Sequence, residues 1–144
     1  MCEKRFVVDG LCALACLIIG LAIYCVSRSH ILFMDWIGIQ GTVPVLNGAI
    51  SKWFVYCLPD GLWYIALLLL MNILCTKYKD ISGHQMVPII MMLLAVILPF
   101  FLEFAQKKNI ISGTYDILDI LTYLITFLLL LICKRNYFLL ALFK

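Results

Sequence analysis

The chain is short, strongly apolar and weakly charged. It has 144 residues, of which 65% are hydrophobic and only 13% are charged, and its mean hydropathy is +1.10. A soluble domain of this size needs about a quarter of its residues charged to solvate its surface. Because those charges are missing, we expect the apolar side chains to face lipid, in a single membrane domain that covers residues 1–144.

The charge pattern and the cysteines exclude two other classes of protein. The net charge is +3, but the basic residues are scattered in pairs and form no continuous basic face, so nucleic-acid binding is not expected. Seven cysteines are present, and most lie in apolar runs without a CxxC motif. Such cysteines act as small apolar packing residues, so we expect no cysteine-based metal site and no cofactor.

Four apolar runs predict four transmembrane helices, at about residues 6–26, 61–76, 86–103 and 117–133. The first run is about 30 Å long as a helix, which matches one hydrocarbon core. The second run is short, but Trp63 suits one membrane interface and Lys77 can reach the other. Pro99 is expected to kink the third. The fold class expected is therefore an all-α membrane protein with a four-transmembrane-helix bundle.

The connection between the first two spans carries its own helical pattern. Thr42 and Pro44 are typical of a helix start. Apolar residues then recur at three- and four-residue spacing, at Leu46, Ala49, Ile50, Trp53, Phe54 and Cys57. This pattern predicts an additional helix over about 43–58 in the first outer loop, which either lies in the membrane interface or re-enters the membrane.

The basic residues favour one orientation. With both termini in the cytoplasm, the inner segments hold seven of them, namely Lys4, Arg5, Lys77, Lys79, Lys134, Arg135 and Lys144, while the outer segments hold Arg28, Lys52, Lys107 and Lys108. Positive residues concentrate on the cytoplasmic side of membrane proteins. We therefore expect a multi-pass protein of the cytoplasmic membrane with both termini inside.

Polar residues that are unusual in lipid gather at one membrane face. Under this topology the outer boundary holds Asp60, Tyr64, Glu103, Gln106, Asp116, Asp119 and Tyr123. Carboxylates at this depth should point into the bundle or into a wet cavity, because exposure to lipid is unfavourable. The seven residues are therefore the candidate ligand-binding site.

Structural explanations remain open for several of these acids. Asp60 and Asp116 suit helix N-caps, and Glu103 can pair with Lys107 or Lys108. Asp119 is harder to explain in this way, since it lies one turn inside its helix. Hard oxygen ligands would suit Mg²⁺ or Ca²⁺, but no diagnostic loop spacing supports a metal site.

The same residues carry a family resemblance. The motif Leu58-Pro-Asp-Gly-Leu-Trp-Tyr64, then Glu103-Phe-Ala-Gln106, then Gly113-Thr-Tyr-Asp-Ile-Leu-Asp119 with Tyr123, resembles the VanZ-like family of small multi-pass membrane proteins, which is named for a member linked to teicoplanin resistance. The family pattern has an Asp opening one helix, E-x-x-Q closing the next and D-x-x-D entering the following one. The resemblance covers about residues 58–130 and implies a bacterial cell-envelope context.

The chain also departs from that family pattern. Gly61 and Tyr64 stand where the family often has Lys and His, Gly113 replaces a common Arg, and Tyr123 replaces an Asn. The acids are therefore less neutralised than in typical members. No positioned nucleophile and base can be identified, so an enzyme is not expected.

Three functions fit these observations. The first is a non-enzymatic envelope protein that binds an envelope lipid, a glycolipid or an amphipathic drug at the acidic and aromatic outer site, with the lipid bilayer as its other partner. The second is an oligomeric transporter or pore, which would require a homo-oligomer. The third is a structural subunit whose polar residues meet a membrane partner protein.

Overall fold

The structure, a computed structural model, describes residues 2–27, 49–82, 86–111 and 115–133. Within these ranges the chain forms four α-helices and no strand, namely α1 (Cys2–Ser27), α3 (Ala49–Ser82), α4 (Met86–Lys107) and α5 (Ile117–Cys133). The predicted all-α class is confirmed.

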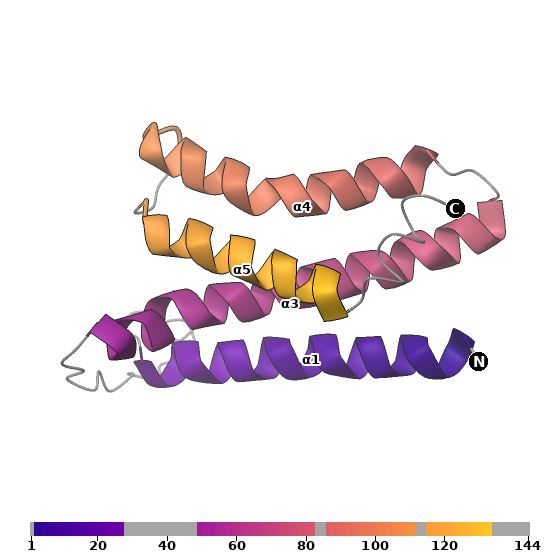
Figure 1. The fold of residues 1–144 in the computed structure, drawn as a ribbon, viewed down its shortest axis with the longest axis horizontal. Helices are drawn as coiled ribbons and strands as arrows, with labels where there is room; N and C mark the ends of the chain where they lie inside the picture. The colour runs from indigo at the N-terminus through magenta and orange to yellow at the C-terminus, as the bar shows by residue number, and fades with distance from the viewer. Residues whose placement is uncertain (1, 28–48, 83–85, 112–114, 134–144) are drawn as a thin grey trace, which may run out of the picture.

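Helix α3 is the centre of the arrangement. It contacts α1, α4 and α5, and α4 also contacts α5. Consecutive helices run in opposite directions, and α1 lies along one side of α3 while α4 lies along the other (Figure 1). The end of α4 and the start of α5 therefore lie together, at the opposite end of the molecule from the start of α1.

Three helices are long and apolar enough to cross a membrane. The qualifying segments are Phe6–Cys25, Trp53–Tyr78 and Met86–Lys107, while α5 is apolar but shorter, with 17 residues. Large apolar side chains cover their outer surfaces, and Val7 and Leu11 on α1 are each 60% exposed. Such a surface is stable in lipid and unfavourable in water, as expected for a membrane protein.

The course of α3 differs from the sequence expectation of two separate helices. Residues 49–58 and the expected span 61–76 belong to one continuous helix, and Pro59 lies inside it. Residues 43–48, where the interfacial or re-entrant helix was expected to begin, lie outside the described residues. Asp60 therefore lies within a helix and does not cap one. Proline removes a single N–H, and membrane helices tolerate that loss because neighbouring groups satisfy the freed carbonyl.

Two clusters of buried side chains hold the helices around α3. The larger contains Tyr64, Leu68, Cys75, Met92 and Ala95, and the smaller contains Ala13, Ala66 and Leu69. The first joins α3 to α4 and α5, whereas the second joins α3 to α1. Small residues at the α1 contact allow close backbone approach, which is how helices pack in lipid without a hydrophobic driving force.

Helix α3 approaches α5 closely at Gly61. A Cβ atom at this position would lie 2.8 Å from Thr122 Cγ2 and 3.3 Å from Thr126 Oγ1. Thr122 cannot easily turn away, because its Oγ1 accepts a hydrogen bond of 3.1 Å from Trp53 Nε1. The distance between the two helices is therefore set by the absence of a side chain at residue 61.

Helix α4 ends in a Schellman motif. Ile110 N donates to Ala105 O at 2.9 Å, Asn109 N donates to Gln106 O at 2.9 Å, and Asn109 has φ 56°. Asparagine adopts this left-handed conformation more readily than most residues. The motif stops α4 just after its polar residues and turns the chain back toward α5.

Gly61→Ala is expected to destabilise the protein by about 1–3 kcal/mol, because the added methyl group overpacks the α3–α5 contact. Thermal unfolding in mild detergent would measure the effect. Gly20→Ala is the matched control, because a Cβ there would meet Pro59 O and Trp63 Cδ1 at an ordinary 3.5 Å. Equal loss of stability in both variants would contradict this account of the packing.

Candidate functional site

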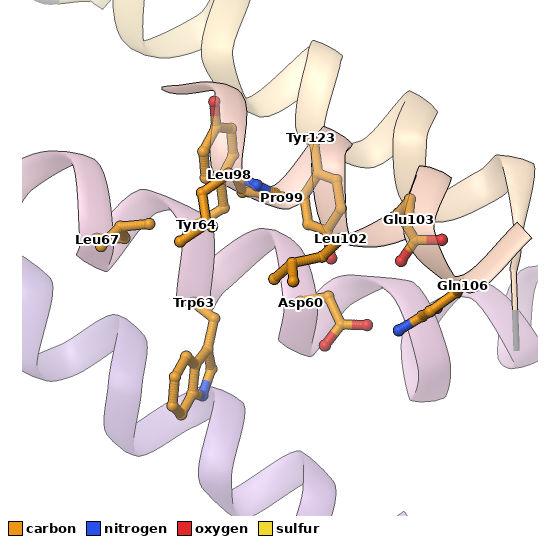
Figure 2. Close-up of a pocket in the computed structure, with 10 residues that line it drawn as sticks. All are labelled: Asp60, Trp63, Tyr64, Leu67, Leu98, Pro99, Leu102, Glu103, Gln106 and Tyr123. Atoms are coloured by element: carbon orange, nitrogen blue, oxygen red, sulfur yellow. The ribbon is translucent and has the colours of Figure 1, made fainter. Parts of the chain in front are cut away.

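A pocket of about 360 Å³ lies between α3 and α4 and is closed on one side by α5. Its lining residues are Asp60, Trp63, Tyr64 and Leu67 from α3, Leu98, Pro99, Leu102, Glu103 and Gln106 from α4, and Tyr123 from α5. Figure 2 shows the carboxylate and amide groups at one end and the aliphatic groups toward the other. The pocket is therefore amphipathic along its length.

Helical spacing explains how the lining is built. The α3 residues follow one another at i, i+3, i+4 and i+7 from Asp60, and those of α4 follow the same pattern from Pro99 to Gln106. Residues at these spacings share one face of a helix. The pocket therefore forms where one face of α3 meets one face of α4, and its polar residues lie nearest the α4–α5 turn.

Glu103 is the most buried charged residue of the pocket, with 6% exposure. Its Oε2 accepts a hydrogen bond of 3.4 Å from the backbone N–H of Asp116, at the entrance to α5. The carboxylates of Asp116 and Asp119 are close enough to act on it electrostatically. A buried carboxylate with acidic neighbours is stabilised by hydrogen-bond donors and by cations, so this end of the pocket favours a donor-rich group.

Asp116 has a structural role, which confirms one of the two sequence interpretations. Its Oδ1 accepts a hydrogen bond of 2.9 Å from Leu118 N, so it is the N-cap of α5. An anionic residue is also favourable here because the helix dipole is positive at its start. Asp116 therefore fixes where α5 begins and does not line the pocket.

Asp119 does not line the pocket, although it lies one turn before Tyr123 on α5. Its carboxylate accepts a hydrogen bond from the thiol of Cys57, a residue of α3 that is 1% exposed. The contact joins α3 to α5 a short distance from the pocket. Asp119 thus belongs to the packing between these helices, alongside the contact between Trp53 and Thr122.

Tyr64 and Tyr123 line the pocket together, and Phe100 packs against both of their rings. The Tyr64 ring packs edge-on against Tyr123 at 5.4 Å and against Phe100 at 6.3 Å between ring centroids. The Tyr64 hydroxyl donates a hydrogen bond of 3.1 Å to the carbonyl of Val96. This hydrogen bond links α3 to α4 about one turn before Pro99.

Tyr123 enters the pocket from α5, and its hydroxyl end points toward Asp60 (Figure 2). The electrostatic influence of Asp60, Asp119 and Glu103 reaches this hydroxyl. A phenol can both donate and accept a hydrogen bond. Tyr123 therefore adds a neutral polar group to a pocket whose other oxygen ligands are mainly acidic.

The candidate residues from the sequence divide into two groups. Asp60, Tyr64, Glu103, Gln106 and Tyr123 line the pocket together, whereas Asp116 and Asp119 do not line it and make other contacts. The division follows from position along α5. Asp116 precedes the first turn of α5, and Asp119 faces Cys57 while Tyr123, one turn later, faces Tyr64.

The aliphatic part of the pocket was missed by the sequence analysis. Leu67, Leu98 and Leu102 were assigned only to membrane spans. Pro99 was expected to kink its span and was not expected to line a pocket. Their spacing from the polar residues was the available signal, since Leu67 lies two turns after Asp60 on one face of α3, and Leu98 and Leu102 lie two turns and one turn before Gln106 on one face of α4. Apolar residues are the common content of every membrane helix, so composition alone could not distinguish them.

The lysines that follow Glu103 lie over aromatic rings. Lys107 Nζ is 4.9 Å from the centroid of Tyr115, and Lys108 Nζ is 5.8 Å from that of Phe104. Cation–π attraction accounts for both positions. Among the residues that the structure describes, no group of three or more His, Cys, Asp or Glu side chains is arranged to hold a metal ion.

Comparison of the chain with protein-family models, with curated proteins and with solved structures found no match.

Tyr64→Phe should lower the free energy of unfolding by about 0.5–1.5 kcal/mol, because the ring packing remains while the hydrogen bond to Val96 O is lost. Thermal unfolding in detergent would measure the change. Tyr123→Phe is the control, since it removes a phenol hydroxyl that faces the pocket. A larger loss of stability from Tyr123→Phe would show that the roles of the two tyrosines are reversed.

Proposed function

We propose that this chain is a non-enzymatic membrane protein of the bacterial cell envelope, of the VanZ-like type, which binds an amphipathic molecule in the pocket between α3 and α4. The ligand would be an envelope lipid, a glycolipid or an amphipathic drug. Its polar part would lie at Asp60, Glu103 and Gln106, and its apolar part along Leu67 and Leu98.

The observation that carries the proposal is the amphipathic lining of a pocket within membrane-spanning helices. Binding pockets for small molecules are mostly apolar with a few convergent polar groups, and volumes of about 300–1,000 Å³ are usual. This pocket has about 360 Å³, an aliphatic wall and a buried carboxylate at one end. A lipid-like molecule has the same division between head and chain.

The location supports an amphiphile more than a water-soluble ligand. Trp63 is 59% exposed, Leu98 is 47% exposed and Leu102 is 41% exposed, and all three line the pocket. On membrane-spanning helices these exposed surfaces face lipid. The pocket would therefore be reached from within the bilayer.

The VanZ-like assignment is supported by the pocket residues that carry the resemblance. Asp60 comes from one segment of the sequence motif and Glu103 and Gln106 come from another, and all three line one pocket. The replacement of charged family positions by Gly61 and Tyr64 leaves a pocket with acidic groups and aromatic walls. We propose that this pocket is the functional centre that the motif describes.

Native mass spectrometry of the protein, released from its own membranes by a mild detergent, tests this function. We expect a monomer that carries a discrete lipid-sized ligand, and we expect Leu102→Trp to lose it because Leu102 reaches across the middle of the pocket (Figure 2). Leu94→Trp is the matched control, since Leu94 is 63% exposed on the same helix and does not line the pocket.

A bare monomer, or a ligand retained by Leu102→Trp, would contradict binding in this pocket. A homo-oligomer without a ligand would favour the transporter or pore. A complex with another protein would favour the structural subunit, whose polar residues are satisfied by a partner helix.

We further propose that both termini face the cytoplasm, so that the polar end of the pocket lies at the outer leaflet. A fluorescent protein fused after Lys144 should then fold and fluoresce, because it remains in the cytoplasm. Alkaline phosphatase fused after Lys108 should be active, because it is exported. The reverse pair of results would invert the orientation and place the pocket at the inner leaflet.

A further inference from the structure

The polar end of the pocket has one carboxylate oxygen available to a ligand. Glu103 is 6% exposed, its Oε2 accepts the Asp116 N–H, and no residue that the structure describes donates a hydrogen bond to its Oε1. A carboxylate can accept about four hydrogen bonds, so most of this capacity is unused. A buried acceptor that lines a cavity favours a ligand with donors.

The rest of the polar end has the same chemical preference. Asp60 lies opposite Glu103 across the pocket, with Gln106 beside them (Figure 2). Ionised carboxylates only accept hydrogen bonds, whereas an ammonium group has three donors and no acceptor. An anionic headgroup such as a phosphate or carboxylate would instead be repelled by Asp60 and Glu103.

The apolar end limits the remainder of the ligand. From Leu98 to Gln106 the lining of α4 extends about 12 Å along the helix axis at 1.5 Å per residue. Together with the cavity volume of about 360 Å³, this length accommodates a headgroup and part of one chain. It does not accommodate both chains of a diacyl lipid inside the cavity.

We propose that the pocket selects amphiphiles that have an ammonium headgroup and a single apolar chain in contact with Leu67 and Leu98. This inference rests on the proposed binding function and specifies its ligand class. The headgroup donates to Glu103 and lies beside Asp60, while the chain leaves past Leu98 and Leu102 into the bilayer. Entry is therefore lateral, along the membrane.

Three probes with the same chain test the proposal, namely dodecylamine, dodecanol and dodecanoate, which are cationic, neutral and anionic at pH 7. Saturable binding to the full-length protein in nanodiscs would be measured by the change in tryptophan fluorescence, since Trp63 lines the pocket. We expect dodecylamine to bind at least about tenfold more tightly than dodecanol, the range of a charge-assisted hydrogen bond, and dodecanoate to bind most weakly.

Two variants, each of which removes one negative charge, separate direct contact with the headgroup from the general electrostatic effect of the acidic end. Glu103→Gln should reduce the preference for dodecylamine over dodecanol to about twofold or less, because the ammonium group then meets a neutral amide oxygen and no longer a carboxylate. Asp116→Asn should keep the tenfold preference, because asparagine is an equally good N-cap and the residue does not line the pocket. If Glu103→Gln does not fold, Asp60→Asn takes its place.

Each outcome is decisive. Equal binding of all three probes would overturn the ammonium selectivity while leaving the proposed amphiphile-binding function intact. The absence of saturable binding by any probe would overturn both. An equal loss of preference in Glu103→Gln and Asp116→Asn would attribute the effect to the acidic end as a whole, which would overturn the assignment to Glu103.

Discussion

The contact between Gly61 and the two threonines of α5 sets the geometry on which the rest of the bundle depends. A glycine here lets α5 approach α3 closely, where Thr122 and Thr126 fill the space that a side chain would occupy. Tyr123 lies between these threonines in sequence, so the same contact fixes how its ring enters the pocket. A larger separation would withdraw Tyr123 from Tyr64 and remove one wall of the cavity.

The pocket also depends on the two prolines that interrupt its walls. Pro59 lies one residue before Asp60 in α3, and Pro99 is itself a lining residue of α4. Each removes a backbone donor from its helix, and in lipid the affected turn needs substitute partners. Close to Pro99, Tyr64 joins α3 to α4 by donating a hydrogen bond to the carbonyl of Val96. The same residue therefore lines the pocket and ties its two main walls together.

Much of the helical architecture could be predicted from the sequence, because long apolar runs allow few alternatives in a membrane. The N-cap role of Asp116 could also be predicted, since it depends on local chemistry. The continuity of α3 through Pro59 could not, because the local rule that proline ends helices is overridden by the neighbouring helices. The contact of Asp119 with Cys57 likewise depends on how α5 packs against α3. The aliphatic wall of the pocket arises only from the meeting of α3 and α4.

The connection between α4 and α5 has a consequence for how the protein is made. The Schellman motif at Asn109, the N-cap at Asp116 and its contact with Glu103 all join residues close in sequence. Closing so short a loop has a small entropic penalty, whereas the contact of Gly61 with Thr122 spans a much longer stretch of chain. The last two helices can therefore leave the insertion machinery as a preformed hairpin that docks onto α3 afterwards. The pocket between α3 and α4, with Tyr123 as one wall, is then completed when this hairpin docks.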